Sequence, residues 1–440
     1  MSKIVPFRGL YYNPKKVADL SLVATPPYDV ITPEEQRRYR QRHPYNIIRL
    51  ILPEGTGADR YKGASNYLQE WEREGILVRE GNPSVYPYQQ IFTSPSGEIK
   101  KREGFMALVR LEPWGQGSIV PHERTTPKPV EDRLNLMEAC RANLSQVFAI
   151  YPDPAGEIEE ILEAVWTASP RYEFRDNEVI HRLWQLDDQG IIAEVGEKML
   201  SKTILIADGH HRYKTALTYR DRMRKRYPSY TERSPFEYTM MYLTSMEGEG
   251  LLILPTHRLV SPMEPFDPGE FYSNLREYFS LQTFDFEDPS GEKWARKALW
   301  KALDKKRGDT YAFGLYISGE RRYLLLTLRE GIRMGGLLRG YPEVLQELDV
   351  TLLDRFILKE LLKAGEEEVG LMKDRDEALE EVYKGRYKMV FFLNPPTIQQ
   401  VKRVADAGEV MPRKSTYFYP KVATGLVIYK IVPNEEVEPI

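Results

Sequence analysis

The chain has 440 residues, of which 42% are hydrophobic and 29% charged, and its formal net charge is −3. This length predicts two or three domains, and the small net charge argues against a surface built for nucleic acid or an anionic membrane. No apolar run reaches the ~18 residues of a membrane span, and the first residues do not have the pattern of a signal peptide. The single cysteine, Cys140, excludes intramolecular disulfides and multi-cysteine zinc sites. We therefore expect a cytoplasmic protein.

Residues 1–115 are predicted to form an α+β region. The segment 32–35 (Thr-Pro-Glu-Glu) has the pattern of a capping box with proline at the first helical position. Apolar residues at helical spacing predict a second helix over residues 61–74. Two strands, 85–93 and 99–111, are predicted to form a hairpin around Pro-Ser-Gly at 95–97.

A middle region, 116–260, carries the two densest polar motifs. The last region, 261–440, is predicted to contain a hairpin near residues 311–328, a strand at 389–393, a helix at 397–407 and a final strand at 425–432. Strands and helices alternate along the whole chain, which favours a mixed α/β or α+β fold.

The most compact polar motif follows an apolar strand, Ile204–Ala207, and reads Asp208-Gly209-His210-His211-Arg212. It precedes a basic helix predicted over residues 213–227. Such an abrupt turn from strand to helix directs backbone N–H groups and the positive end of the helix dipole at one point. An arginine fork and two imidazoles make that point suitable for a phosphate. Three roles remain open for Asp208: it caps the helix, orients His210 or binds Mg²⁺.

A second motif, Pro121-His122-Glu123-Arg124-Thr125-Thr126-Pro127, is a loop stiffened by proline, with a helix predicted from about Val130. Glu123 lies between a histidine and an arginine in the sequence. Such neighbours can position a carboxylate and shift its pKa, so Glu123 is a candidate general base. A zinc-protease helix is excluded, since Thr126 stands where the second histidine would be required. The alternative is a solvated charged turn.

A third motif near the C-terminus spans residues 410–421 and contains Lys414, Ser415, Thr416 and Tyr417 after Pro412-Arg413. One cation and neighbouring hydroxyl groups suit a phosphate or a carboxylate. The alternative is a tight basic turn before a strand. The chain contains no Walker A sequence, dinucleotide fingerprint, nucleophile elbow or protein-kinase signature.

The three motifs resemble those of known protein families. The segment 208–212 resembles the phosphate-binding motif of the ParB/sulfiredoxin superfamily, in particular its free-serine kinases, which convert L-serine to O-phospho-L-serine. The archaeal ADP-dependent kinase has similar segments in the same order, here 121–123, 208–212 and 408–416. Over nearly its whole length the chain also resembles the bacterial and archaeal domain-of-unknown-function family "ten-fifteen".

The resemblance implies an α+β fold with a ParB/sulfiredoxin-like core (116–260) and additional α/β subdomains. It implies a kinase that transfers a phosphoryl group from a nucleotide (ATP or ADP) or pyrophosphate to the hydroxyl of free L-serine, with Mg²⁺ as cofactor. The implied roles are catalysis by Glu123 and Asp208, Mg²⁺ binding by Asp208, donor binding by His122, Arg124, Gly209, His210, His211 and Arg212, and substrate binding by Lys414, Ser415, Thr416 and Tyr417.

Some features depart from this pattern. The archaeal kinase is much shorter, and Thr215 stands where ParB-like proteins often have alanine. The identity of the phosphoryl donor therefore stays open. Two alternatives are a phosphohydrolase or nucleotide hydrolase in which Glu123 activates water, and a ParB-like nucleotide-responsive DNA-binding module. The net charge of −3 and the lack of a helix-turn-helix pattern argue against the DNA-binding module. We expect small-molecule partners and neither nucleic acid nor membrane, with no prediction of the oligomeric state.

Overall fold

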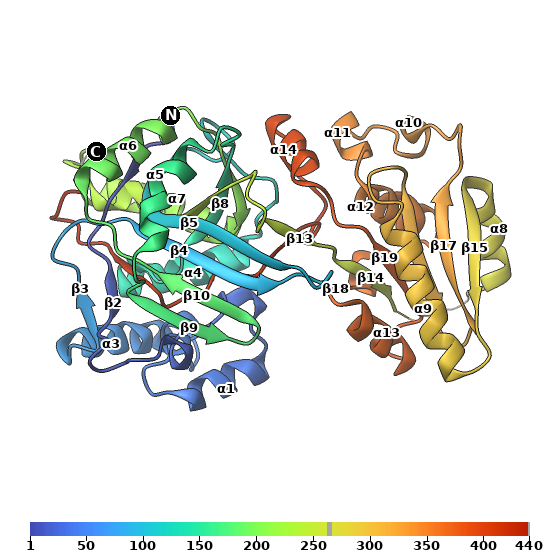
Figure 1. Cartoon of the computed structure of the whole chain (residues 1–440), viewed down its shortest axis with the longest axis horizontal. Coiled ribbons are helices and arrows are strands. Elements are labelled where there is room, and N and C mark those ends of the chain that lie inside the picture. Colours follow the sequence, from blue (N-terminus) through green and yellow to red (C-terminus); the bar gives the residue numbers. More distant parts are fainter. Residues whose placement is uncertain (262–265, 439–440) are drawn as a thin grey trace. The chain divides into compact units, whose positions relative to one another are not determined.

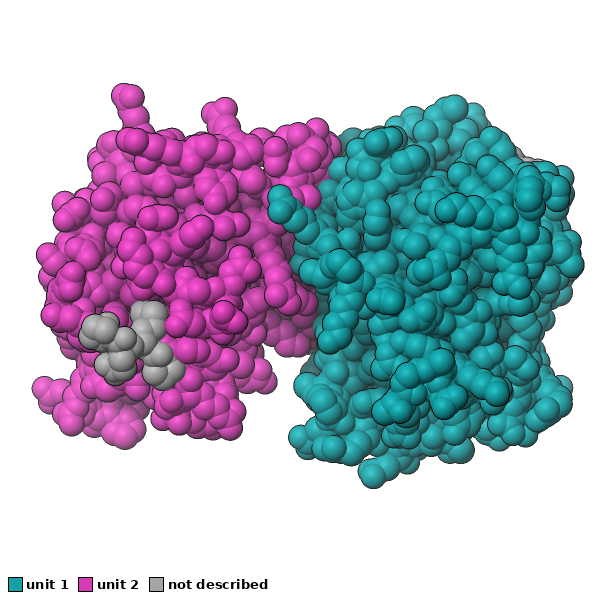
Figure 2. Space-filling view, turned by 180° about the vertical axis from the view of Figure 1, so that it is seen from behind, with its two compact units in different colours: residues 1–252, 420–440 teal, residues 253–419 magenta. Residues whose placement is uncertain are grey.

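The computed structural model describes residues 1–261 and 266–438, and the chain divides into two compact units. Unit 1 comprises Met1–Leu252 and Pro420–Ile440, and unit 2 comprises Ile253–Tyr419. Figure 2 colours unit 1 teal and unit 2 magenta. The boundary expected at residue 115 falls inside unit 1, and the end of the region expected at 261–440 returns to unit 1. This return has a physical cause, because Thr424 and Ile428 form β-bridges with Thr25 and Leu10.

Unit 1 is built on a nine-stranded mixed sheet (Figure 1). Its strands lie in the order β6-β11-β8-β12-β5-β4-β10-β9, and β1 pairs with the end of β5. Their bounds are β1 Ile4–Val5, β4 Tyr86–Thr93, β5 Ile99–Arg110, β6 Ile119–Val120, β8 Val147–Tyr151, β9 Tyr172–Asp176, β10 Val179–Leu183, β11 Ile204–Asp208 and β12 Tyr238–Ser245. Two short ribbons join β2 (Leu10–Tyr12) to β3 (Leu77–Arg79) and β21 (Tyr429–Lys430) to β7 (Ala142–Asn143).

The helices of unit 1 surround this sheet. They are α1 Pro33–Arg42, α2 Ile48–Ile51, α3 Asp59–Arg73, α4 Pro127–Cys140, α5 Glu157–Thr167, α6 Gln189–Leu200 and α7 His210–Arg226, with short 3₁₀ turns at Leu20–Leu22, Tyr28–Val30 and Pro235–Glu237. Apolar residues of α5, α6 and α7 share one buried core with alternate residues of β5, β8, β11 and β12. These three helices therefore cover one face of the sheet, as is expected when amphipathic helices bury their apolar stripes.

Unit 2 contains a six-stranded antiparallel sheet in the order β15-β17-β16-β19-β14-β18. The strands are β14 His257–Val260, β15 Phe279–Asp285, β16 Ala312–Ile317, β17 Arg322–Leu328, β18 Val369–Met372 and β19 Met389–Leu393. The helices are α8 Pro268–Tyr278, α9 Pro289–Asp304, α10 Met334–Leu337, α11 Glu343–Gln346, α12 Asp349–Leu352, the π-helix η4 Leu353–Leu361, the 3₁₀ turn Glu366–Glu368, α13 Arg375–Tyr383 and α14 Ile398–Asp406. A further ribbon pairs β13 (Leu252–Leu254) with β20 (Tyr417–Tyr419). Residues of α9 and α13 form a core with five of the six sheet strands, and this core stabilises unit 2.

Local sequence signals predicted several of these elements. Thr32 and Glu35 form the expected capping box of α1. The predicted β4–β5 hairpin is present, with Gly97 at φ 87° in its turn. The pairs β16–β17 and β19–α14 also occur close to their predicted positions. The protein is thus mixed α/β with several sheets, as expected.

Three predicted boundaries were wrong. Helix α4 begins at Pro127 rather than near Val130, because Pro127 occupies the first helical position. Helix α7 begins at His210 rather than Tyr213, so the His-His-Arg cluster forms its first turn. The strand predicted at 425–432 is reduced to β21, because only Tyr429 and Lys430 pair with β7. Among the described residues, no helix is long and apolar enough to span a membrane.

Candidate functional site

The two motifs of the middle region meet because two strands run parallel. Strand β6 pairs with β11 in parallel register, with Ile119 beside Ile204 and Val120 beside Leu205. The loop after β6 therefore leaves the sheet at the same edge as the turn after β11. This edge, at the carboxyl ends of parallel strands, is where α/β proteins commonly bind ligands. Glu123 and Asp208 thus come from distant sequence segments to one edge.

The turn from β11 to α7 depends on Gly209. Gly209 has φ 90°, in the left-handed region, and a Cβ atom there would lie 2.8 Å from the Arg212 guanidinium carbon. Glycine satisfies both constraints. Just before it, the register of β11 against β8 shifts between Ile206 and Asp208, an irregularity that redirects Asp208. No side chain of the described residues caps α7.

Asp208 lies between two cations. One carboxylate oxygen accepts from Arg212 at 2.5 Å, and the other accepts from Lys421. Arg212 also donates to the backbone carbonyl of Gln146, and its side chain is only 10% exposed. Burial alone would raise the pKa of Asp208, but Lys421 and Arg212 together hold that pKa below its usual range. Asp208 therefore positions two cations and does not cap α7.

His122 and His210 are buried against each other, with ring centroids 4.6 Å apart. The His122 Nδ1–H donates to the Ile206 carbonyl at 2.8 Å, and the His122 backbone N–H donates to His210 Nε2 at 3.3 Å. Each bond fixes a tautomer: a carbonyl only accepts, and a nitrogen that receives an N–H bond carries no proton. His210 consequently carries its proton on Nδ1, which lies 3.8 Å from Glu123 Oε2.

Burial keeps both imidazoles neutral at pH 7. It lowers the pKa of His122 to about 4 and the pKa of His210 well below its usual value. Neither ring brings a full positive charge to the site. His210 Nδ1 lies near the Glu123 carboxylate at the start of α7, and the Glu123 side chain is 28% exposed.

The rest of the loop also contacts α7. The Thr126 backbone N–H donates to His211 Nε2 at 3.2 Å, immediately before Pro127 starts α4. Arg124 lies exposed in the same loop. The start of α4 thus lies close to the start of α7, and the loop that carries Glu123 runs beside the first turn of α7.

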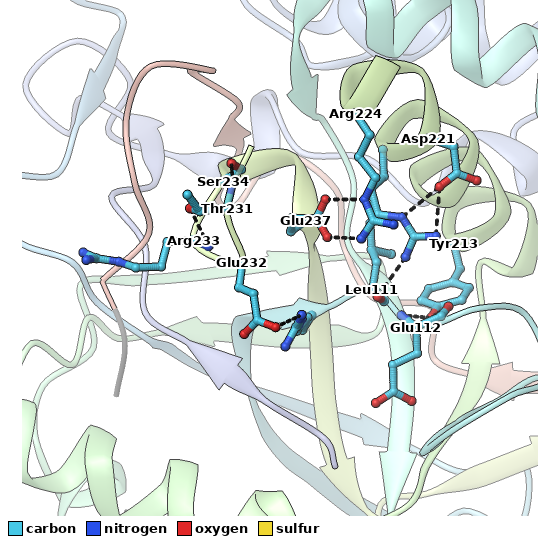
Figure 3. Close-up of polar contacts among 12 residues, drawn as sticks. Leu111, Glu112, Tyr213, Asp221, Arg224, Thr231, Glu232, Arg233, Ser234 and Glu237 are labelled. Atoms are coloured by element: carbon cyan, nitrogen blue, oxygen red, sulfur yellow. Dashed lines mark hydrogen bonds and ion pairs between the residues drawn. The ribbon is translucent and has the colours of Figure 1, made fainter. Parts of the chain in front are cut away.

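Side chains along α7 hold the helix against the segments that follow β5 and precede β12 (Figure 3). The Tyr213 hydroxyl donates to the Glu112 carbonyl at 2.8 Å, and Arg220 donates to the Leu111 carbonyl at 2.9 Å. Arg224 pairs with both oxygens of the buried Glu237, at 2.7 and 2.5 Å. These arginines are anchors for the helix, so its basic character serves packing as well as the helix dipole.

The predicted Mg²⁺ site at Asp208 does not fit this geometry. Both carboxylate oxygens of Asp208 already accept from cations. Within residues 1–261 and 266–438, no cluster of three or more His, Cys, Asp or Glu side chains is arranged to hold a metal ion. A metal at Asp208 would have to displace Lys421 or Arg212.

Most of the third motif belongs to unit 2, which ends at Tyr419. Lys414 has φ 55°, and Ser415 donates to the Pro412 carbonyl at 2.5 Å, which closes a tight turn. The buried Arg258 donates to the Arg413 carbonyl at 3.3 Å, and Asp354 pairs with Arg258 at 3.0 Å. Lys414, Ser415, Thr416 and Tyr417 therefore lie on a turn with its own support, and their assignment to substrate binding stays a prediction.

Sequence reasoning did not assign Lys421 or Gln146 to the site. Lys421 closes the third motif, but the chain returns to unit 1 at Pro420, so Lys421 reaches Asp208 while Lys414 belongs to unit 2. The signal for Lys421 was its place in a dense basic and aromatic segment. Gln146 contributes a backbone carbonyl, which no sequence pattern marks.

Comparison with solved structures gives distant likenesses. The chain is 14% identical to a free serine kinase in complex with AMP, covering 73% of this chain and 88% of that chain, with a TM-score of 0.29. A conserved hypothetical protein from Pyrococcus furiosus is 13% identical, with coverage of 73% and 92% and a TM-score of 0.29. C-terminally truncated SbnI from Staphylococcus aureus is 8% identical, with coverage of 72% and 85% and a TM-score of 0.33.

Among curated proteins, no sequence matches this chain. A family match covers most of its length: the family described as "Protein of unknown function (DUF1015)" matches residues 4–351. This stretch includes both motifs that form the edge site of unit 1, Pro121–Thr126 and Asp208–Arg212. The chain belongs to the DUF1015 family.

Proposed function

We propose that this protein is a phosphotransferase, and specifically a kinase that transfers a phosphoryl group to the hydroxyl of free L-serine. One observation carries the proposal: Glu123 Oε2 lies 3.8 Å from His210 Nδ1, at the uncapped start of α7. The start of a helix can bind an anion such as a phosphate. A carboxylate beside it therefore lies where a general base could act on the acceptor of that phosphate. The choice of L-serine rests on the motif resemblance to free-serine kinases.

In this proposal the first turn of α7 binds the donor phosphate. Its backbone N–H groups, from Gly209 to Arg212, and the helix dipole supply positive potential without any ionised histidine. Lys421 and Arg212 add two cations whose positions Asp208 fixes. Phosphoryl transfer depends mainly on positioning and charge neutralisation, which such an arrangement provides.

Glu123 acts as the base for the acceptor. The serine hydroxyl oxygen forms a bond to the transferring phosphorus, the bond from that phosphorus to the donor's leaving oxygen breaks, and the hydroxyl proton moves to Glu123. His210 presents Nδ1–H to this carboxylate at 3.8 Å, with a tautomer fixed by the His122 backbone. A positioned base of this kind contributes roughly 10²–10⁴-fold to the rate.

The donor in this proposal is a nucleotide or pyrophosphate. Arg124, exposed in the same loop, is proposed to contact it. The β6–β11–α7 corner is proposed to be the phosphate corner of a ParB/sulfiredoxin-like core. The turn at 414–417 is proposed to bind serine or phosphate.

A donor panel tests the activity. Purified protein is incubated with L-serine and ATP, ADP or pyrophosphate, and both O-phosphoserine and free phosphate are measured, the first by mass spectrometry. O-phosphoserine with at least one donor supports the kinase. Free phosphate without O-phosphoserine would instead favour the hydrolase, and absence of both products would contradict an enzyme of either kind.

The variant Glu123→Gln tests the base. It keeps the side-chain shape but removes the basic oxygen, so kcat should fall by roughly 10²–10⁴-fold while donor binding by calorimetry is retained. Glu131→Gln is the matched control, because Glu131 lies on the exposed surface of α4 in the next segment. Near-normal turnover in Glu123→Gln would move the base to another residue.

A further inference from the structure

Lys421, one of the two cations beside Asp208, comes from the segment in which the chain returns to unit 1. This return segment, residues 420–423, belongs to no strand, so no ladder of sheet hydrogen bonds holds it in place. It is followed directly by the β-bridge between Thr424 and Thr25. The position of Lys421 therefore depends on what else contacts the main chain of the return segment.

Two buried side chains hold the beginning of this segment. Arg102, on β5, donates to the Pro420 carbonyl at 2.6 Å. The amide nitrogen of Gln90, on β4, donates to the Lys421 carbonyl at 3.0 Å. The sheet register places Gln90 directly opposite Arg102, and Arg102 also donates to the Gln90 amide oxygen. Gln90 and Arg102 are 0% and 1% exposed, so water does not compete for these hydrogen bonds.

A third buried side chain holds the end of the segment and links it to Arg212. The Gln146 amide nitrogen donates to the Ala423 carbonyl at 2.9 Å, and the Gln146 backbone carbonyl accepts from Arg212. Both cations that contact Asp208 are therefore held by buried groups. Arg212 is held by its own guanidinium, and Lys421 is held through its main chain.

Burial of the Arg102 guanidinium has a cost that packing alone does not explain. The guanidinium carbon lies 4.7 Å from the Phe148 ring centroid and 5.9 Å from the Tyr242 ring centroid. Aromatic faces attract a cation, but an apolar side chain would fill the same space without the desolvation cost of a buried charge. An apolar side chain could not donate to the Pro420 carbonyl, whereas a guanidinium presents its donors in a fixed planar fork. Arg102 is thus suited to fix the direction of the main chain beside Lys421.

We propose that Arg102, together with Gln90, is a positioning residue for the anion site at the start of α7. By fixing the carbonyl groups of Pro420 and Lys421, this pair directs the Lys421 ammonium towards Asp208 and towards a phosphate bound by the first turn of the helix. Neither Arg102 nor Gln90 touches the reacting atoms. The inference rests on the anion site of the proposed function, and it holds for any phosphoryl donor and any acceptor.

Calorimetry with inorganic pyrophosphate on the full chain tests the effect on anion binding. Lys421→Met should weaken pyrophosphate binding roughly tenfold to hundredfold, the loss expected for one charge-assisted hydrogen bond. Arg102→Met should weaken it by a similar factor, because the ammonium is then no longer directed at the anion. The double variant should bind no more weakly than Lys421→Met alone, since both changes remove the same contact. Arg102→Lys keeps a charge and a donor near the Pro420 carbonyl, so it should weaken binding less than Arg102→Met.

Arg171→Met is the matched control. Arg171 also donates to a glutamine amide oxygen, that of Gln185, and its guanidinium carbon lies 4.3 Å from the Tyr11 ring centroid. It directly precedes β9, at the opposite side of the sheet from β11, and among the described residues none of its partners belongs to the return segment. This variant should change pyrophosphate affinity by less than about twofold. Equal losses of affinity in Arg102→Met and Arg171→Met, or unchanged affinity in Arg102→Met, would overturn the proposal.

Urea unfolding needs no ligand, so it separates a failure of this inference from a failure of the proposed anion site. If Arg102 positions Lys421, the fold-change of the unfolding constant in the double methionine variant should be smaller than the product of the two single fold-changes. Gln90→Met replaces Arg102→Met in both experiments if the latter does not fold. Independent effects would overturn the positioning of Lys421. Non-additive effects in a protein that binds no pyrophosphate would support that positioning and refute the anion site.

Discussion

Replacing Lys421 by methionine tests the electrostatic core of the candidate site. Lys421 and Asp208 form an ion pair in which the side chains are only 11% and 13% exposed. Methionine keeps most of the apolar length of lysine and removes its charge. The carboxylate of Asp208 would then rely on Arg212 alone.

The expected cost follows from this geometry. Breaking a fully buried ion pair costs roughly 3–5 kcal/mol, because the remaining charge stays buried and uncompensated. Here Arg212 still pairs with Asp208 at 2.5 Å, so the loss is closer to that of one charge-assisted hydrogen bond. We expect the free energy of unfolding to fall by about 1.5–3 kcal/mol.

The effect should depend on pH with a defined sign. The folded-state pKa of Asp208 is held below its ordinary value of 3.8, so the pair contributes its full stability above pH 4. That stability is lost as the pH falls through the folded-state pKa. The difference between Lys421→Met and the unchanged protein should therefore be largest at neutral pH and shrink as the pH falls below 4.

Urea unfolding at pH 7 and pH 3 measures this difference, with Lys198→Met as the matched control. Lys198 pairs with Glu157 at 2.7 Å in the same unit, but these side chains are 39% and 41% exposed. An exposed pair contributes only about 0.2–1 kcal/mol. If Lys421→Met costs no more than Lys198→Met at pH 7, the buried-charge argument is refuted.

Three more expectations can be checked. Gly209→Ala should lower the free energy of unfolding by about 1–3 kcal/mol, because alanine would have to adopt φ 90° with its Cβ against the Arg212 guanidinium. Urea titrations measure this loss, and an unchanged unfolding midpoint would contradict it. The His122 ring should show no titration between pH 5.5 and 8 by NMR, since burial lowers its pKa to about 4; its contribution to stability should be lost as the pH falls from 6.5. Arg258→Met should destabilise unit 2 by roughly 3 kcal/mol, because it leaves Asp354 without its partner, and a loss below 1 kcal/mol would count against that role.

The sequence by itself determined the local structure around the site. A capping box starts α1 at Pro33, and a β-run followed by Asp-Gly ends β11 and starts α7. These features depend on residues close together in the sequence. A capping side chain accepts a hydrogen bond from a nearby backbone N–H, and a glycine adopts positive φ where other residues would be strained. For this reason the corner from β11 to α7 could be predicted without a structure, whereas its role in phosphate binding stays a prediction.

Only the tertiary structure decided which residues meet there. The parallel pairing of β6 with β11 brings Glu123 to His210, and the return of the chain to unit 1 at Pro420 brings Lys421 to Asp208. Strand partners are set by core packing over the whole sheet, which short sequence patterns do not encode. Burial also decided the protonation of His122 and His210, since their pKa values fall only when the surrounding chain excludes water. The residue types thus follow from the sequence, but their charges and partners follow from the fold.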